Sequence, residues 1–224
     1  MKNNKKLGAL LIIQSLFIFV PMYILGTAIG WPDSLNFPAK EILPLIHSQA
    51  TAVSIGYFLY FLYSILFFFT GTILVTELKK TSTNQTSMNI AATAAGLSAL
   101  ARVIGILRWL VPFPLLAASY VSTVDPNLRL IQETIYTVGN NYGGGVGELL
   151  GVTIFASMWT CIVSWEFITQ KNLPTWLGYF GIAAAFASLA LMLEVFGIVV
   201  SVSISQTLFH VWLLCVGVYF LIRK

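Results

Sequence analysis

Residues 50–75 read ATAVSIGYFLYFLYSILFFFTGTILV, a run that contains no charged side chain. A helix needs about 20 apolar residues to cross the hydrocarbon core of a bilayer, so this run is long enough to span it. Ile65–Phe69 is uninterrupted apolar sequence, whereas a strand of a membrane barrel alternates apolar with polar side chains. The run therefore predicts a transmembrane helix.

The rest of the chain has the same character. Of its 224 residues, 58% are hydrophobic and only 9% are charged, against about 25% charged residues in soluble domains. So few polar side chains cannot cover the surface of a soluble protein, and we expect membrane lipid as the surrounding partner. The net charge of +4 does not indicate nucleic-acid binding, because the basic residues lie at the ends of apolar runs and form no patch.

Six apolar stretches are long enough to cross a membrane. They lie near Leu7–Ile29, Ala50–Val75, Ile90–Val111, Val146–Trp165, Trp176–Val200 and Gln206–Ile222. The first is longer than the 7–15 apolar residues, roughly, of a signal peptide, so we interpret it as a helix that stays in the protein. The connections are too short for a soluble domain. The sequence therefore predicts an all-α, polytopic bundle that forms a single transmembrane domain over residues 1–224.

The lysines and arginines predict the orientation, because cytoplasmic loops are enriched in them. With the N-terminus inside, the inner side holds Lys2, Lys5, Lys6, Lys79, Lys80, Lys171, Arg223 and Lys224, and the outer side holds Lys40 and Arg129. Trp165 and Trp176 flank one inner loop, as residues of an interfacial aromatic belt do. Both termini are therefore expected on the cytoplasmic side.

The two longer outer segments carry local signals. Ala39–His47 is expected to form a short amphipathic helix on the membrane surface. Asp125 followed by Pro126 predicts a helix start, since an acidic residue caps the helix and proline suits its first position. Gly143–Gly145 is expected to break the chain before the fourth helix, as a hinge or as a backbone nest for an anion. Three prolines are candidate kink sites, namely Pro21, Pro112 and Pro114.

Charge inside the membrane costs about 2.5–3.5 kcal/mol per group even on low scales, so such groups mark candidate functional sites. The candidate ligand-binding residues are Arg102, Arg108, Glu148, Glu194, His210 and His47. At about 1.5 Å per helical residue, Arg102 lies about 18 Å from the inner surface, near the midplane. Arg108 and Glu194 lie about 27 Å in, and the other three candidates are placed near the same outer level.

We hypothesise that Arg108 pairs with Glu194 or Glu148 and that His210 lines the same cavity, since pairing offsets part of the cost of desolvation. Arg102 needs either a carbonyl freed by a kinked helix or a cavity. Structural alternatives stay open: Glu148 can complement a helix dipole, Arg108 can reach the outer interface, and His210 can be a hydrogen-bonded core residue.

Known catalytic and cofactor patterns are missing from the sequence. It contains only two histidines, too few for a common catalytic zinc site without carboxylate help, and we predict neither a metal nor a cofactor. Cys161 and Cys215 both lie in apolar runs and are expected as free core residues. The Gly147–Gly151 segment has small residues four apart, which permits close helix contact.

Several motifs in order resemble those of a known family. They are Arg108–Pro112 followed by Leu115–Ala117, then Gly147–Gly151, then Leu173–Gly178. In this spacing they resemble an uncharacterised bacterial family of six-helix membrane proteins, described only as a domain of unknown function. The resemblance implies the six-helix fold and a bacterial cytoplasmic membrane. It carries no activity or catalytic residue.

Three functions are compatible with these features. The first is a protein that binds or transports a small polar ligand, a lipid headgroup or a proton at a polar site in the outer leaflet. The second is an intramembrane enzyme that uses Glu148 or Glu194 as a base and Arg108 to stabilise an anion. The third is an accessory subunit whose charges are structural. The oligomeric state does not follow from the sequence.

Overall fold

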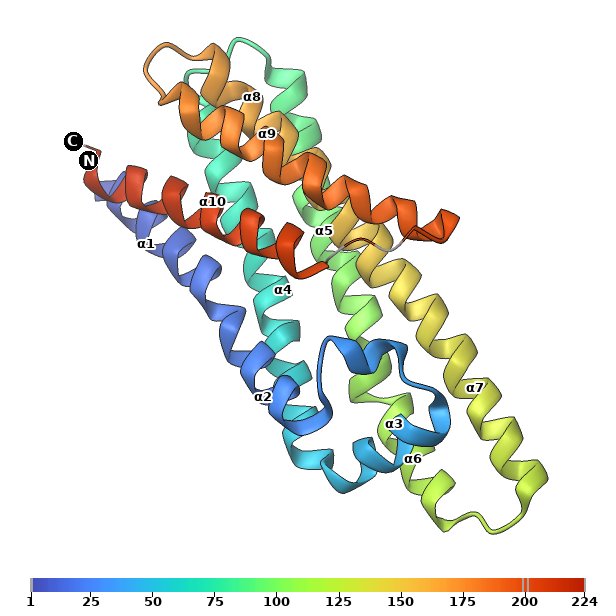
Figure 1. Ribbon diagram of the computed structural model, residues 1–224. Helices are drawn as coiled ribbons and strands as arrows, with labels where there is room; N and C mark the ends of the chain where they lie inside the picture. Colours follow the sequence, from blue (N-terminus) through green and yellow to red (C-terminus); the bar gives the residue numbers. More distant parts are fainter. Residues whose placement is uncertain (1, 199, 201, 224) are drawn as a thin grey trace.

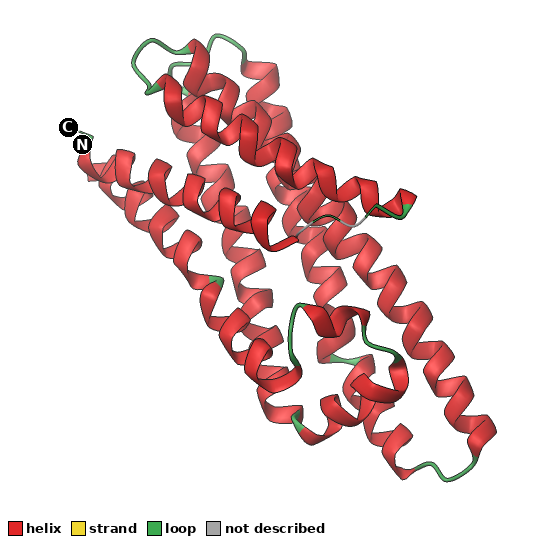
Figure 2. Cartoon of the chain, viewed as in Figure 1, coloured by secondary structure: helices red, strands yellow, loops and turns green. Residues whose placement is uncertain are grey.

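The computed structural model describes residues 2–198, 200 and 202–223, apart from the side chains of residues 2, 3, 194, 202 and 203. The chain is 88% helical, without strands in this described part, and short loops join the helices (Figure 2). Six helical segments are long and apolar enough to cross a membrane. The predicted all-α bundle of six membrane-spanning helices is therefore confirmed.

The elements follow one another along a long bundle (Figure 1). In chain order they are α1 (Lys2–Phe17), α2 (Phe19–Ile29), η1 (Asp33–Asn36), α3 (Ala39–Ser48), α4 (Ala50–Lys79), α5 (Gln85–Leu110), α6 (Pro112–Ser122), α7 (Pro126–Gly144), η2 (Gly145–Phe155), α8 (Ala156–Thr169), α9 (Thr175–Leu189), η3 (Ala190–Phe196) and α10 (Val202–Ile222). The first span consists of α1 and α2, the third of α5 and α6, and the fourth of α7, η2 and α8.

Two of the predicted proline kinks interrupt spans. Pro21 has no N–H group, and its ring crowds the carbonyl of the residue four positions earlier, Phe17, where α1 ends. The second break lies at Val111, directly before Pro112, and it separates α5 from α6. Pro114 lies in the first turn of α6, where its missing N–H leaves no hydrogen bond unmade.

The fourth span is continuous, so the predicted break at Gly143–Gly145 is wrong. The chain starts α7 as expected, with the side chain of Asp125 accepting a hydrogen bond from the backbone N–H of Asn127 at 2.9 Å. It then passes from α7 through the π-helix η2 into α8, giving one helical segment from Pro126 to Thr169. The glycines do not loosen the chain there. They leave room for α5, which lies against η2.

Glycine backbones set the distance between α5 and η2. A Cβ added to Gly105 would lie 2.6 Å from the Cα of Gly147, and one added to Gly151 would lie 2.9 Å from the Cγ of Arg102. Ser98 also donates a hydrogen bond to the carbonyl of Gly151 at 2.7 Å. The close helix contact predicted for Gly147 and Gly151 is therefore present.

The apolar core divides into two clusters along the length of the bundle. The first packs α1, α4, α5, α8, α9 and α10 together, around Trp159 and Trp212. The second joins α2, α3, α6 and α7 to the far ends of α4 and α5, around Trp109. The predicted amphipathic helix is present as α3, and it buries Ile42 and Ile46 in this second cluster.

The fifth span is shorter than predicted. Its α-helix ends at Leu189, and η3 continues only to Phe196, instead of one helix reaching Val200. Gly197 follows with a left-handed φ of 79°, which L side chains rarely adopt and which ends the helical path. The connection from α9 to α10 therefore lies beside the middle of the long helices and not at their far end (Figure 1).

The two termini lie side by side at one end of the bundle (Figure 1). Helices α1 and α10 approach closely there, since a Cβ on Gly217 would lie 3.0 Å from the carbonyl oxygen of Gly8. Both ends of the chain are therefore on one side of the membrane. Which side that is remains the prediction made from the lysines and arginines.

A reporter fusion tests this orientation. We expect green fluorescent protein at the C-terminus to fluoresce in bacteria, because it folds in the cytoplasm, and alkaline phosphatase at the same place to stay inactive. Phosphatase inserted after Arg129, on the side predicted to be external, is the positive control. An active C-terminal phosphatase fusion would reverse the assignment.

Substituting the glycine contact tests the packing of α5 on η2. Gly105→Ala places a methyl group against the backbone of Gly147, so we expect a loss of about 1–3 kcal/mol in the free energy of unfolding. Gly145→Ala is the matched control, because no atom beyond its own helical turn and chain neighbours lies within 4 Å of the added Cβ, and its free energy of unfolding should change by less than about 1 kcal/mol. Denaturation in detergent measures both. Equal effects would contradict the packing.

Candidate functional site

The expected single layer of ionisable groups is divided into two centres. Arg108 lies with Glu148 in a hydrogen-bonded network between α5, α7 and η2. Arg102, one and a half turns earlier on α5, lines a cavity between η2, α8, α9 and α10. His210 lies with the second centre, since Arg102 and Tyr63 both interact with it.

In the Arg108 network each of the three guanidinium nitrogens has a partner. Nη2 contacts Oε1 of Glu148 at 3.1 Å, Nε donates to Oδ1 of Asn140 at 3.2 Å, and Nη1 donates to the carbonyl of Gly105 at 2.9 Å. Asn140 in turn donates to the carbonyl of Leu35 at 2.9 Å. The network therefore ties α5 to α7, to η2 and to the η1 segment.

Burial differs across the ion pair. The side chain of Arg108 is 9% exposed, whereas that of Glu148 is 57% exposed. Gly143 leaves the space for the arginine, because a Cβ there would lie 2.5 Å from the Cδ of Arg108. The predicted pairing of Arg108 with Glu148 is present. Because each guanidinium nitrogen has a partner on a neighbouring segment or on its own helix, this centre is suited to bracing helices.

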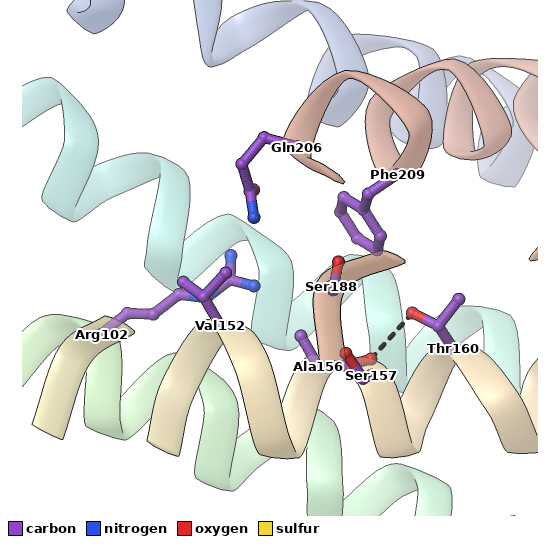
Figure 3. A pocket seen from close by; sticks show the side chains of 8 residues that line it. All are labelled: Arg102, Val152, Ala156, Ser157, Thr160, Ser188, Gln206 and Phe209. Atoms are coloured by element: carbon purple, nitrogen blue, oxygen red, sulfur yellow. Dashed lines mark hydrogen bonds between the residues drawn. The ribbon is translucent and has the colours of Figure 1, made fainter. Parts of the chain in front are cut away.

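The second centre is a small polar cavity, which we call the Arg102 cavity (Figure 3). It has room for about one water molecule. Its lining consists of Arg102, Val152, Ala156, Ser157, Thr160, Ser188, Gln206 and Phe209. Figure 3 shows the guanidinium of Arg102 on one side of the cavity, with the amide of Gln206 directed toward it and the hydroxyl groups on the opposite side.

Arg102 is buried with a residual exposure of 4%. Its guanidinium carbon lies 4.7 Å from the ring centroid of Phe67, and its Nε is buried without a hydrogen-bond partner. No described carboxylate forms an ion pair with it. Ser157, across the cavity, is 1% exposed and its hydroxyl also has no partner. The cavity thus contains an arginine and a hydroxyl group with unused donors.

His210 is a buried histidine with two hydrogen bonds. Nδ1 lies 2.6 Å from the carbonyl oxygen of Gln206, and Nε2 lies 2.7 Å from the hydroxyl of Tyr63. A carbonyl oxygen can only accept, so Nδ1 carries a hydrogen, and in the neutral ring Nε2 accepts from Tyr63. Tyr63 also interacts with Arg102 and therefore connects the histidine to the cavity.

One predicted site residue lies outside both centres, and the side chain of another is not described. His47 is exposed at the end of α3, on the second apolar cluster's side of the bundle. Glu194 belongs to η3, but its side chain lies outside the described residues, so its predicted pairing with Arg108 stays a prediction. Within the described residues, no group of three histidine, cysteine or acidic side chains is placed to hold a metal ion.

Several polar residues of these centres were missed by reasoning from formal charge. Tyr63, Ser157 and Gln206 carry no charge, and hydroxyl groups are common in membrane helices. Ser157 and Thr160 are three residues apart, so they share a helix face, and this spacing is the signal that was available. Nothing in the sequence pairs that face with Arg102.

Removing the arginine of the first centre tests its bracing role. Arg108→Gln leaves the acceptor oxygens of Asn140 and Gly105 without their donors. We therefore expect the free energy of unfolding to fall by about 2 kcal/mol or more. Arg129→Gln, on the exposed face of α7, is the control and should change stability by less than about 1 kcal/mol. Chemical denaturation in detergent compares the two. Indistinguishable curves would show that the network carries no stability.

Comparisons with known proteins agree with the architecture. A family model described as "Domain of unknown function (DUF4386)" matches residues 7–222. A search of curated proteins and a search of solved structures find no match. The match covers all six spans and both polar centres, as the resemblance of the ordered motifs implied. On this evidence the chain belongs to the DUF4386 family of multi-pass membrane proteins.

Proposed function

We propose that this protein binds a small monovalent inorganic anion, such as a halide or nitrate, in the Arg102 cavity and carries it across the membrane. The observation that supports this is an arginine buried in a span, facing a cavity, with a free Nε donor and without a described carboxylate partner. An anion would supply the counter-charge that no described carboxylate provides to this arginine.

Energetics favour an occupant with negative charge. An isolated cation inside a protein loses its hydration, and the cost is several kcal/mol, roughly, unless a counter-charge or hydrogen bonds replace the water. The ring of Phe67 offsets only part of this cost, since a cation–π contact contributes about 0.5–2 kcal/mol. A bound cation would be repelled. A bound water would satisfy donors but leave the charge uncompensated.

The size and donors of the cavity favour a small ion. The space admits about one water molecule, so a phosphate or a lipid headgroup does not fit without expansion. Nε of Arg102 and the hydroxyl of Ser157 have free hydrogens to donate. Thr160 donates to the carbonyl of Ala156 at 2.7 Å, so its hydrogen is already used (Figure 3).

We propose transport of the anion, and not binding alone, because the cavity lies within the membrane-spanning segments. Ser188 and Gln206 line it from the ends of α9 and α10 that face η3, while Arg102 and Ser157 lie well inside their own spans. Transporters commonly place the binding site within the membrane, between segments that can rearrange around it. The π-helix η2 beside the cavity is such a segment, because π-helical turns recur at functional sites.

The two alternatives receive less support. An enzyme that uses Glu148 as a base with Arg108 as its anion-stabilising partner needs free donors, but each of the three guanidinium nitrogens of Arg108 already has a protein partner. An accessory subunit with purely structural charges fits the Arg108 network. It leaves the buried Nε of Arg102 unexplained, since a structural arginine should have partners for its buried donors.

Anion-dependent stability tests the proposal. We expect sodium chloride, bromide or nitrate to raise the melting temperature of the purified protein saturably, relative to sodium gluconate at equal ionic strength. An anion concentration of ten times the dissociation constant should raise the free energy of unfolding by about 1.4 kcal/mol. Arg102→Gln should abolish the increase, and Arg129→Gln should preserve it.

Uptake of radioactive chloride into proteoliposomes then measures carriage, with the same two variants. If Arg102→Gln unfolds, Ser157→Ala is the second variant and should weaken the anion effect by removing one free donor. The proposal fails if no small anion stabilises the wild-type protein, or if all variants respond equally.

A further inference from the structure

His210 occupies a position where protonation would change the hydrogen bonding around the cavity. Nδ1–H donates to the carbonyl of Gln206, whose side chain lines the cavity, and Nε2 receives the hydroxyl hydrogen of Tyr63. His210 is buried, with 6% of its surface exposed. Any proton that His210 binds must enter at Nε2, since Nδ1 already carries one.

Protonation at Nε2 reverses the bond to Tyr63. The imidazolium then donates from both nitrogens, and the hydroxyl hydrogen of Tyr63 needs a new acceptor. Arg102, which also interacts with Tyr63, has only donors and cannot accept it. Two acceptors are open to this hydrogen: Oε1 of Gln14, which is buried beside Tyr63 without a hydrogen-bond partner, and an anion held by Arg102. The anion is therefore one of two groups that can accept from Tyr63 once the ring is protonated.

The positive charges of Arg102 and of a protonated His210 also favour binding of the proton together with an anion. Among the described side chains, Arg102 from α5 is the charged group that acts on His210, and Tyr63 from α4 is the titratable group in contact with it. The rings of Phe19 from α2 and Phe209 from α10 also lie beside it. A second positive charge beside Arg102 is unfavourable in this interior unless an anion is bound.

We infer that His210 is a proton-binding site coupled to the Arg102 cavity, so that one proton and one anion bind together and cross the membrane as a neutral pair. This inference rests on the proposed function, and it adds the co-transported ion. The proton comes from solution to Nε2 of His210, the hydroxyl of Tyr63 turns toward the anion, and both ions leave together when the bonds reverse.

Proteoliposomes that contain a pH-sensitive dye test the coupling. With an inward chloride gradient and the voltage clamped by potassium and valinomycin, we expect the interior to acidify by one proton for each chloride taken up. The rate should not depend on the clamped voltage, because the pair is neutral. Liposomes without protein correct for leakage of hydrogen chloride.

The possible results are distinguishable. Chloride uptake without acidification, or uptake that follows the voltage, overturns the proton coupling and leaves the proposed function intact. No chloride uptake and no chloride-dependent stabilisation overturn the proposed function, and the coupling with it. The wild-type ratio decides between these results without any variant.

Two variants then locate the proton site. His210→Gln keeps a polar side chain but cannot bind the proton, and Tyr63→Phe removes the hydroxyl that turns. We expect each to reduce proton flux at least tenfold in folded preparations and to weaken chloride-dependent stabilisation, because coupled ligands favour each other's binding reciprocally. His47→Gln, an exposed histidine, is the control and should keep the one-to-one ratio. One-to-one coupling in folded His210→Gln protein would show that the proton binds elsewhere.

Discussion

The close contact of α5 with the fourth span determines where both arginines lie. Gly143, Gly147 and Gly151 are spaced four apart and meet Arg108, Gly105 and Arg102 in turn. In the middle, two glycine backbones touch, and on either side a glycine leaves the space that an arginine side chain fills. Helices without large side chains at their contact approach closely in membranes, where packing and hydrogen bonds drive association. Both polar centres lie along this contact between α5 and the fourth span, which we call the seam.

The two arginines at this contact differ in whether a carboxylate compensates their charge. Arg108 has a carboxylate, an amide and a carbonyl as partners, and its carboxylate partner is more than half exposed. Arg102 is more deeply buried and has an aromatic ring and a cavity around it. A stabilising network and a binding site therefore coexist on one helix, about nine ångströms apart along its axis. The difference lies in what the neighbouring helices bring to each residue.

The π-helix η2 connects the centres physically. Glu148 near its start belongs to the Arg108 network, and Val152 near its end lines the Arg102 cavity. A helix with one extra residue per turn hydrogen bonds less favourably than an α-helix, so its persistence here depends on tertiary contacts. The contact with α5 supplies them, through Ser98 and the glycines. Rearrangement of η2 would act on both centres at once.

The sequence by itself determined that the chain lies in a membrane, how many spans it has, where most helices start and to which family it belongs. It could do so because membrane-spanning length and apolar composition are local properties. It also identified Arg102, Arg108, Glu148 and His210 as anomalies, since charge in a span is costly wherever the partners are. The glycine run was misread, because three glycines in sequence do not reveal the helix packed against them. Only the tertiary structure decided that every guanidinium nitrogen of Arg108 has a partner while Arg102 faces a cavity, and that Tyr63 joins His210 to that cavity. Those facts depend on contacts between spans up to 147 residues apart, and no local pattern encodes which helix faces meet.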